Sequence, residues 1–288
     1  MHLPVLLREV IEALSPRSGG IYIDATIGLG GHSEEILKLI GPGGKLIGID
    51  RDEEALKIAG KRLSDRRVIL KSGNLSEIER LLYPHGISEV DGILFDLGVS
   101  MLQLKNLERG FSFISDERLD MRMDRRQEVS AWDVVNRYSE KELERILKEF
   151  GEERLARRIA KAIASHRSKK TIDTCSELSG IVEGVYGRRG KLHSATKTFQ
   201  ALRIEVNREF DELRAGLDSS LRLLKRGERL CVISYHSLED RIVKNFIRDS
   251  VRQGFLRVIT KKPVTPGPEE LMVNPSSRSA KLRAAEKI

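Results

Sequence analysis

The sequence contains few cysteines, and those it has are scattered. Cys175 and Cys231 are far apart in the chain, and neither belongs to a Cys-x-x-Cys motif or to a Cys/His cluster. Structural zinc sites need several such ligands at short spacing. The sequence therefore predicts no zinc site, and we expect no metal at all.

Long apolar runs are also lacking. No stretch approaches the ~20 residues that a membrane-spanning helix needs. The N-terminus has no basic start followed by a long apolar segment, as a signal peptide would have. We therefore expect a cytoplasmic protein that has no membrane partner.

Positive charge, in contrast, is abundant. The 288 residues carry a formal net charge of +8, and the sequence pI is about 9.5. A basic surface attracts polyanions over long distances, and nucleic acid is the most common such partner. A hydrophobic fraction of 40% is ample for a packed core, and the length allows one large domain or two smaller ones.

Short β-rich runs alternate with helical stretches in the first third of the chain. We predict strands at 21–25, 45–50, 68–71 and 91–96, and helices at 33–40 and 52–63. This alternation indicates parallel βαβ units. The runs at 256–261 and 281–286 predict a terminal antiparallel strand pair at the edge of the sheet.

The next buried-looking strand after residue 96 is 230–234, and the intervening segment is mainly helical. Capping boxes begin at Ser139 and Thr174, and helices are predicted at 140–150 and 152–166. Residues 195–224 are predicted to form a long amphipathic helical region of one helix or two. We therefore predict an all-α domain, residues 110–205, inserted into an α/β domain made of residues 1–109 and 206–288.

A glycine-rich loop, Asp24–Ser33, follows the first predicted strand, and Asp50 ends the second. Such a loop lets the backbone and a helix N-terminus approach a ligand, while a carboxylate at Asp50 can accept both ribose hydroxyls of an adenosine. The spacing of Gly28, Gly30 and Gly31 departs from the dinucleotide pattern G-x-G-x-x-G. S-adenosylmethionine is therefore favoured over NAD, with Asp24 placed to meet its cationic amino-acid moiety.

Two further polar residues are candidates near this ligand. Asp96 ends the fourth predicted strand, where ligands of doubly wound sheets bind; the alternative is a helix cap. Gln103, shortly after it, either hydrogen-bonds the cofactor or lies on a surface loop.

At this point the residues resemble a known family, the bacterial 16S ribosomal RNA cytosine-N4 methyltransferases (MraW or RsmH). The matching stretches span nearly the whole chain in the expected order: Tyr22–Thr26, Gly28–Ser33, Gly48–Asp52, Asp91–Ser100, Glu108–Phe113, Leu119–Asp124, Thr196–Ile204, Ser234–Val243, Asn274–Pro275 and Arg278–Glu286. One local departure is Ser194, where relatives usually have proline.

The resemblance implies a class I methyltransferase fold, a Rossmann-like doubly wound sheet, with an inserted helical domain that recognises the substrate. It implies S-adenosylmethionine as methyl donor, S-adenosylhomocysteine as product, and the N4 amino group of a cytidine in 16S ribosomal RNA of the small subunit as acceptor. Carried over by position, the cofactor-binding residues are Gly30, Gly31, His32, Asp50, Leu75, Asp96 and Gln103.

The chemistry needs an acceptor for the hydrogens of a poorly nucleophilic amino group. Asp96 is the first candidate for this catalytic role. The Pro-Pro-aromatic sequence that follows the acidic residue in many amino-methyltransferases is replaced here by Leu97–Ser100. Stacking on the base must then come from other aromatic residues, such as Phe111, Phe113 or Tyr235, unless these belong to the core. Methylation at C5 would need a cysteine nucleophile, for which neither cysteine is suited.

Other candidates lie later in the chain. His236 follows the fifth strand and is a second catalytic candidate, with capping of the next helix by Ser237 as the alternative. Gln200, Arg203 and Asn207 share one helical face and are candidates for substrate contacts. Basic clusters in the insert are candidates for binding RNA phosphates: Arg122, Arg125 and Arg126; Arg154, Arg157, Arg158 and Lys161; Arg167, Lys169 and Lys170; and Arg188, Arg189 and Lys191.

Three rival functions stay open on sequence grounds. These are a nucleotide-dependent oxidoreductase, a non-catalytic RNA-binding scaffold, and a methyltransferase acting on DNA or protein. The sequence does not decide the oligomeric state, the nucleotide modified or the assembly stage of the substrate.

Overall fold

A computed structural model describes residues 4–187 and 193–288. The chain divides into two compact units. The first comprises Met1–Gly98 and Phe210–Ile288, and the second comprises Val99–Glu209. The sequence predicts the boundaries at 109/110 and 205/206, whereas the structure has them at 98/99 and 209/210. The second unit is larger than predicted because α5 (Met101–Lys105) and η3 (Leu107–Arg109) also belong to it.

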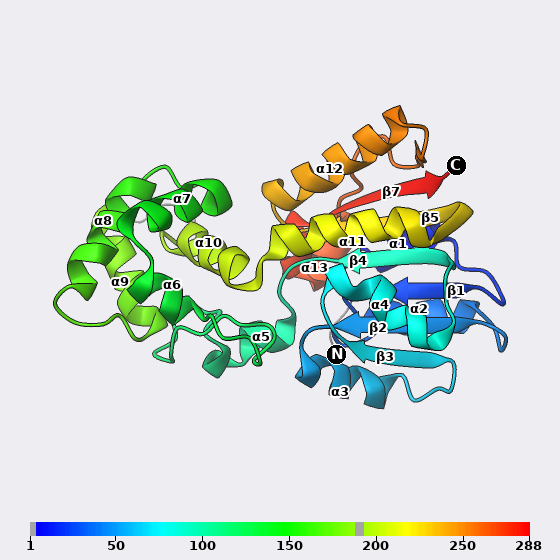
Figure 1. Cartoon of the computed structure of the whole chain (residues 1–288), viewed down its shortest axis with the longest axis horizontal. Helices are drawn as coiled ribbons and strands as arrows, with labels where there is room; N and C mark the ends of the chain where they lie inside the picture. The colour runs from blue at the N-terminus through cyan, green and yellow to red at the C-terminus, as the bar shows by residue number, and fades with distance from the viewer. Residues whose placement is uncertain (1–3, 188–192) are drawn as a thin grey trace. The chain divides into compact units, whose positions relative to one another are not determined.

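The first unit is built on a seven-stranded sheet in the order β3-β2-β1-β4-β5-β7-β6 (Figure 1). Strands β1 to β5 are parallel, and β7 is antiparallel to both β5 and β6. This topology confirms the predicted class I methyltransferase fold. The strands are β1 (Ile21–Asp24), β2 (Lys45–Asp50), β3 (Val68–Ser72), β4 (Val90–Asp96), β5 (Leu224–Ser234), β6 (Leu256–Val258) and β7 (Lys281–Lys287).

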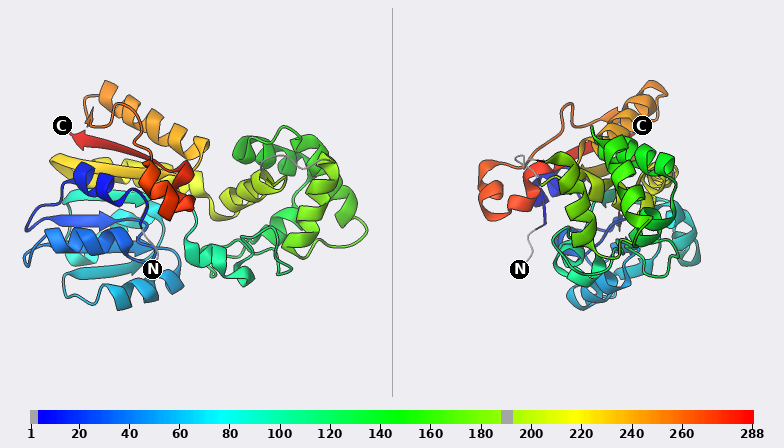
Figure 2. Two further views of the ribbon diagram at one scale, coloured as in Figure 1. Left: turned by 180° about the vertical axis from the view of Figure 1, so that it is seen from behind. Right: turned by 90° about the vertical axis from the view of Figure 1, so that its left-hand side faces the viewer.

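Helices cover both faces of this sheet because successive strand residues point to opposite sides. Ile23 of β1 packs in the cluster that contains residues of α4, α11 and α12, whereas its neighbour Tyr22 packs with residues of α1, α2 and α3 (Figures 1 and 2). The helices and short 3₁₀ turns of this unit are α1 (Leu7–Leu14), α2 (Gly31–Leu39), α3 (Glu53–Arg62), η1 (Leu75–Glu77), α4 (Ile78–Leu82), η2 (Tyr83–His85), α11 (Glu209–Leu223), α12 (Ser237–Arg252), α13 (Pro268–Val273) and η4 (Pro275–Ser279).

The second unit is helical and has its own core. Its larger helices are α6 (Ala131–Arg137), α7 (Glu140–Gly151), α8 (Ala156–Arg167), α9 (Cys175–Tyr186) and α10 (Thr196–Asn207). Buried apolar side chains from all five form one hydrophobic cluster. The predicted capping boxes at Ser139 and Thr174 are both present. The end of α7 differs from the prediction, because Gly151 is the last helical residue and Glu152, at φ 47°, is the left-handed cap.

None of the helices formed by residues 4–187 and 193–288 is long and apolar enough to cross a membrane.

Candidate active site

Three aspartates mark the carboxyl ends of neighbouring parallel strands. Asp24 ends β1, Asp50 ends β2 and Asp96 ends β4. The sheet order reverses between β1 and β4. On one side of β1 lie β2 and β3, and on its other side lie β4 and β5. Doubly wound sheets bind ligands outside the carboxyl ends of their strands at such a switch point. Asp24 and Asp96 lie on the two strands that flank it.

The glycine-rich loop between β1 and α2 is held by Asp50. Its Oδ2 accepts a hydrogen bond from the Gly28 backbone N–H at 2.9 Å, and its Oδ1 accepts one from the Asp52 N–H at 2.9 Å. Each carboxylate oxygen can accept a further bond, as a ribose diol would require. Gly30 has φ 79° and is the N-cap of α2, a conformation that favours glycine.

The segment before α1 packs against this loop. A Cβ at Gly31 would lie 2.5 Å from the Pro4 ring, so only glycine fits at the start of α2. This close approach brings the Val5 carbonyl oxygen to 2.9 Å from Nε2 of His32. Burial lowers the pKa of His32. Because the Val5 carbonyl oxygen can only accept, Nε2 donates to it, and the lowered pKa favours the neutral ring with Nδ1 as an acceptor.

Asp96 faces this histidine from β4. Its Oδ2 lies 3.6 Å from Nδ1 of His32, and its Oδ1 accepts a hydrogen bond from the Tyr235 hydroxyl at 2.8 Å. The Asp96 backbone N–H donates to Thr26 Oγ1 at 2.6 Å. Gly98, at φ 99°, lets the loop after β4 pass the Tyr235 ring, because a Cβ there would be 3.3 Å from the ring.

The charges of this cluster are set mainly by burial. Burial raises the pKa of Asp96 to about 7, against the lowering effect of the hydrogen bond from Tyr235. Burial also raises the pKa of Asp24 to about 6, although Ser33 Oγ donates to its Oδ2 at 2.7 Å. The pKa of Tyr235 is raised well above its usual range by burial and by Asp96, so its hydroxyl stays a donor. An acid with a pKa near 7 is suited to proton transfer at neutral pH.

His236 has a capping role that the sequence assigned to Ser237. Its Nδ1 accepts a hydrogen bond from the Glu239 N–H at 3.3 Å, and Glu239 Oε2 accepts bonds from the backbone N–H groups of Tyr235 and His236. The N-cap of α12 is therefore His236. The turn it forms also fixes the backbone of Tyr235.

Of the two remaining predicted cofactor residues, Leu75 lies at this same edge of the sheet, whereas Gln103 belongs to the other unit. Leu75 is buried at the start of η1, just after the carboxyl end of β3. Gln103 belongs to the second unit, where its side chain accepts a hydrogen bond from the Ser100 N–H at 3.0 Å and completes the capping box of α5. The structure thus brings Gly30, Gly31, His32, Asp50, Leu75 and Asp96 to one edge of the first unit.

Each of the three candidate substrate residues on α10 has a partner inside the second unit. Gln200 donates to the Phe150 carbonyl oxygen at 2.9 Å, and Arg203 is paired with Glu209 at 2.7 Å. Asn207 is 3% exposed, accepts from the Met123 N–H and donates to the Met121 carbonyl oxygen, both at 2.8 Å. These intramolecular bonds account for the polar residues on this face of α10 without any contact to RNA. A role of the three residues in binding substrate stays a prediction.

Aromatic residues and cysteines complete the set of sequence candidates. Phe111 is buried in the core of the second unit, where Phe113 stacks on His193 with ring centroids 4.1 Å apart. Cys175 and Cys231 are both buried, and burial raises the pKa of each thiol to about 12. Neither is a thiolate near neutral pH, so neither is fit to be the nucleophile that C5 methylation needs.

The whole chain resembles known proteins. The model of the MraW methylase family matches residues 1–288. The chain belongs to the MraW methylase family. It is 52% identical over 292 residues to the protein named ribosomal RNA small subunit methyltransferase H of Persephonella marina, covering 100% of this chain and 99% of that protein. The protein of the same name from Caldicellulosiruptor bescii is 49% identical, covering 100% of this chain and 99% of that protein. The one from Acidobacterium capsulatum is 48% identical, covering 99% of this chain and 98% of that protein.

As a member of the MraW methylase family, the protein is an S-adenosylmethionine-dependent methyltransferase. The residues present fit this cofactor. Asp50 offers two carboxylate oxygens with spare acceptor capacity beside a glycine loop, as a ribose requires. A Cβ at Gly28 would meet only the Thr26 carbonyl oxygen, at 3.9 Å, so the loop backbone is open to a ligand. The buried carboxyl group of Asp24 and the partly exposed one of Asp96 favour a cation over a pyrophosphate.

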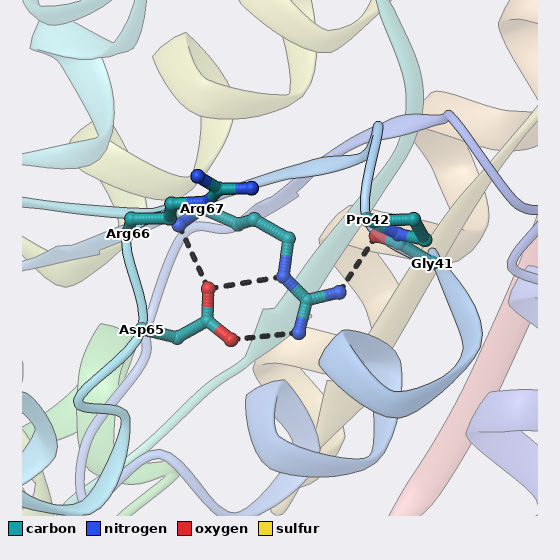
Figure 3. Close-up of a pocket in the computed structure, with 5 residues that line it drawn as sticks. All are labelled: Gly41, Pro42, Asp65, Arg66 and Arg67. Carbon is teal, nitrogen blue, oxygen red and sulfur yellow. Dashed lines mark hydrogen bonds and ion pairs between the residues drawn. The ribbon is translucent and has the colours of Figure 1, made fainter.

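The protein also has a surface pocket of about 600 Å³ that lies away from the three aspartates. It is lined by Gly41, Pro42 and residues 65–67, which precede the amino ends of β2 and β3. The Arg67 guanidinium of this pocket is already engaged within the protein, because it donates to Asp65 and to the Gly41 carbonyl oxygen (Figure 3). Ligands of parallel sheets bind at the opposite edge, so this pocket is not the cofactor site.

Proposed function

We propose that the protein transfers a methyl group from S-adenosylmethionine to the N4 amino group of a cytidine in 16S ribosomal RNA of the small subunit. The observation that carries this proposal is Asp96. Its carboxyl group lies at the switch point, one oxygen is fixed by Tyr235, and its pKa is near 7. The full-length likeness to proteins named ribosomal RNA small subunit methyltransferase H supports the choice of ribosomal RNA.

The cofactor supplies a methyl group activated by a sulfonium. Asp50 would hold the ribose hydroxyls, and the backbone of Gly28–Gly31 would line the loop next to it. Leu75 and Gln103 are proposed as further cofactor contacts. Asp24 and Asp96 would balance the positive charge, since an opposite charge nearby favours the ionised carboxylate. The pKa of Asp96 would therefore fall when the cofactor binds.

Asp96 would act on the acceptor. The lone pair of a cytosine amino nitrogen is delocalised into the ring, so a hydrogen-bond acceptor on the amino hydrogens helps to localise it and takes up developing positive charge. Because Tyr235 occupies Oδ1, Oδ2 is the oxygen left for this role. A stacked cytidine would have to leave the helix to reach it. His236, which follows Tyr235 in the chain, stays a second candidate, although its Nδ1 serves as a cap.

The proposed partner is the small ribosomal subunit, which in bacteria would place the reaction in the cytoplasm. The net charge of +8 is suited to RNA. We propose that the helical unit recognises the substrate.

The test is methyl transfer from labelled S-adenosylmethionine to small subunits that lack the modification, to bare ribosomal RNA and to duplex DNA, followed by nucleoside analysis. We expect label in N4-methylcytidine from RNA with the wild type, and none with Asp96→Ala although that variant folds. Label only in DNA, or normal turnover by Asp96→Ala, would refute the proposal.

A further inference from the structure

The basic clusters of the helical unit differ in how much of their charge is already used. Arg122 is paired with Asp120 at 2.6 Å and Arg126 with Asp124 at 2.8 Å. A paired cation has less charge to offer to a phosphate.

The cluster at the C-terminal end of α8, Arg167, Lys169 and Lys170, is also largely engaged. Arg167 donates to the carbonyl oxygens of Val135 and Tyr138, and Lys170 is paired with Glu177 at 2.8 Å. Arg188, Arg189 and Lys191 lie outside the described residues.

Within the described residues, Arg125 and Lys169 are the single unpaired cations of these two clusters, whereas the cluster at α8 has three. Arg154, Arg157 and Lys161 are exposed, and within the described parts of the chain none of their side chains forms a hydrogen bond or a salt bridge. Arg158 makes one bond, to the Val185 carbonyl oxygen at 3.3 Å. We call these four residues the α8 basic face.

Local sequence and helix geometry keep this face cationic. Residues 154–172 contain seven Lys and Arg and no Asp or Glu, so no acidic residue lies one turn away on the same helix. Arg157 and Lys161 are four residues apart and therefore lie on one side of α8. Figure 1 shows α8 packed beside α7 and α9.

The other side of α8 is fully used in packing. Ala156, Ile159, Ala160 and Ile163 are buried in the core of the helical unit. An amphipathic helix that binds a membrane must present its apolar side to the lipid, and here that side is covered. The exposed side offers charge alone, and its complement is a polyanion.

We propose that the α8 basic face binds the phosphate backbone of the RNA substrate. This inference rests on the proposed function for the identity of that RNA. Arginine and lysine contacts to phosphate supply affinity and orientation and do not read sequence. The α8 basic face would therefore hold the RNA, while the choice of nucleotide is made elsewhere.

The test compares two full-length triple variants that remove the same charge. R154A/R157A/K161A removes unpaired cations of the α8 basic face. R126A/R137A/K170A removes three exposed cations of the same unit that are paired with Asp124, Asp133 and Glu177. Alanine is the best helix former, so α8 should persist. Thermal unfolding and S-adenosylmethionine affinity check that both variants are folded.

The readout is the dissociation constant for a bare 16S ribosomal RNA transcript, measured from low to physiological salt. We expect R154A/R157A/K161A to weaken binding at least about tenfold and to lower the slope of log K against log salt by about 2. The paired-cation control should change binding less than about threefold. If both variants lose the same amount of RNA affinity, the effect is due to net charge alone, and the inference is overturned. Unchanged RNA binding by R154A/R157A/K161A would also overturn it and favour an acidic protein partner.

Methyl transfer by the wild type separates this inference from the proposed function. If the wild type methylates ribosomal RNA and R154A/R157A/K161A keeps full RNA affinity, the inference fails and the function stands. If the wild type transfers no methyl group to RNA but R154A/R157A/K161A still loses RNA affinity, the proposed function fails and the α8 basic face stands as an RNA-binding surface.

Discussion

The Tyr235 hydroxyl donates a 2.8 Å hydrogen bond to Oδ1 of Asp96, joining the turn after β5 to the end of β4. Three features make this bond possible: a glycine at position 98 that lets the loop pass the ring, the N–H···Oε2 bond from Tyr235 to Glu239, and the adjacent pairing of β4 with β5. The bond orients the carboxyl group and opposes the effect of burial on its pKa. Tyr235 is therefore a positioning residue for the proposed proton acceptor.

Replacing Tyr235 by phenylalanine keeps the ring and removes only this bond. A hydrogen bond to a charged group contributes about 1.5–3 kcal/mol, so we expect kcat to fall about tenfold or more while S-adenosylmethionine affinity is unchanged. Because the bond lowers the pKa of Asp96, its loss should move the pH–rate profile to higher pH. The control is Tyr83→Phe, at a side chain that is 85% exposed. An unshifted pH profile would refute the positioning role.

Asp96→Asn should make the protein more stable at high pH than the wild type. The folded-state pKa is raised from 3.8 to about 7, so the wild type loses stability as pH rises through that window. Asparagine cannot ionise and avoids this loss. One quarter of the Asp96 side chain is exposed, so we expect a gain of only about 1–2 kcal/mol at pH 8 and almost none at pH 4. Denaturant unfolding at pH 4 and pH 8 measures the difference in the free energy of unfolding between Asp96→Asn and the wild type. The same difference at both pH values would contradict the raised pKa.

Asp50→Ala should weaken cofactor binding. It removes the carboxylate that holds the Gly28 N–H and is proposed to accept the ribose hydroxyls. Loss of charged hydrogen bonds predicts an increase in the dissociation constant of about 10–100-fold, measured by calorimetry with S-adenosylmethionine. Asp65→Ala, at the opposite edge of the sheet beside Arg67, should bind normally. Equal affinities for Asp50→Ala and the wild type would place the adenosine elsewhere.

Asn207→Ala separates a structural role from a substrate contact on α10. The substitution leaves the Met123 N–H and the Met121 carbonyl oxygen without their side-chain partner inside the helical unit. An unpaired buried polar group costs about 1–3 kcal/mol, so we expect a lower unfolding midpoint and unchanged RNA affinity of the folded protein. Normal stability with weakened RNA binding would restore Asn207 as a substrate contact.

Local signals predicted most elements, and the start of β5 was missed because it depends on pairing with a strand that is distant in sequence. Asp52, Ser139 and Thr174 cap the helices that follow them, because the capping bond lies within three residues of the cap. The strand predicted at 230–234 begins at Leu224. Its first part is polar, and pairing with β4 rather than an apolar run makes it a strand.

The sequence alone determined the βαβ order, the helical insert, the glycine loop with Asp50, and the family resemblance, because these depend on periodicity and short motifs. Only the tertiary structure decided which groups meet. Tyr235 is 139 residues from Asp96, and Val5 reaches His32 across 27 residues. The structure likewise separated the engaged cations from those of the α8 basic face, because pairing depends on which residues folding brings together. A residue's neighbours in space, and hence its charge state and remaining binding capacity, are properties of the fold.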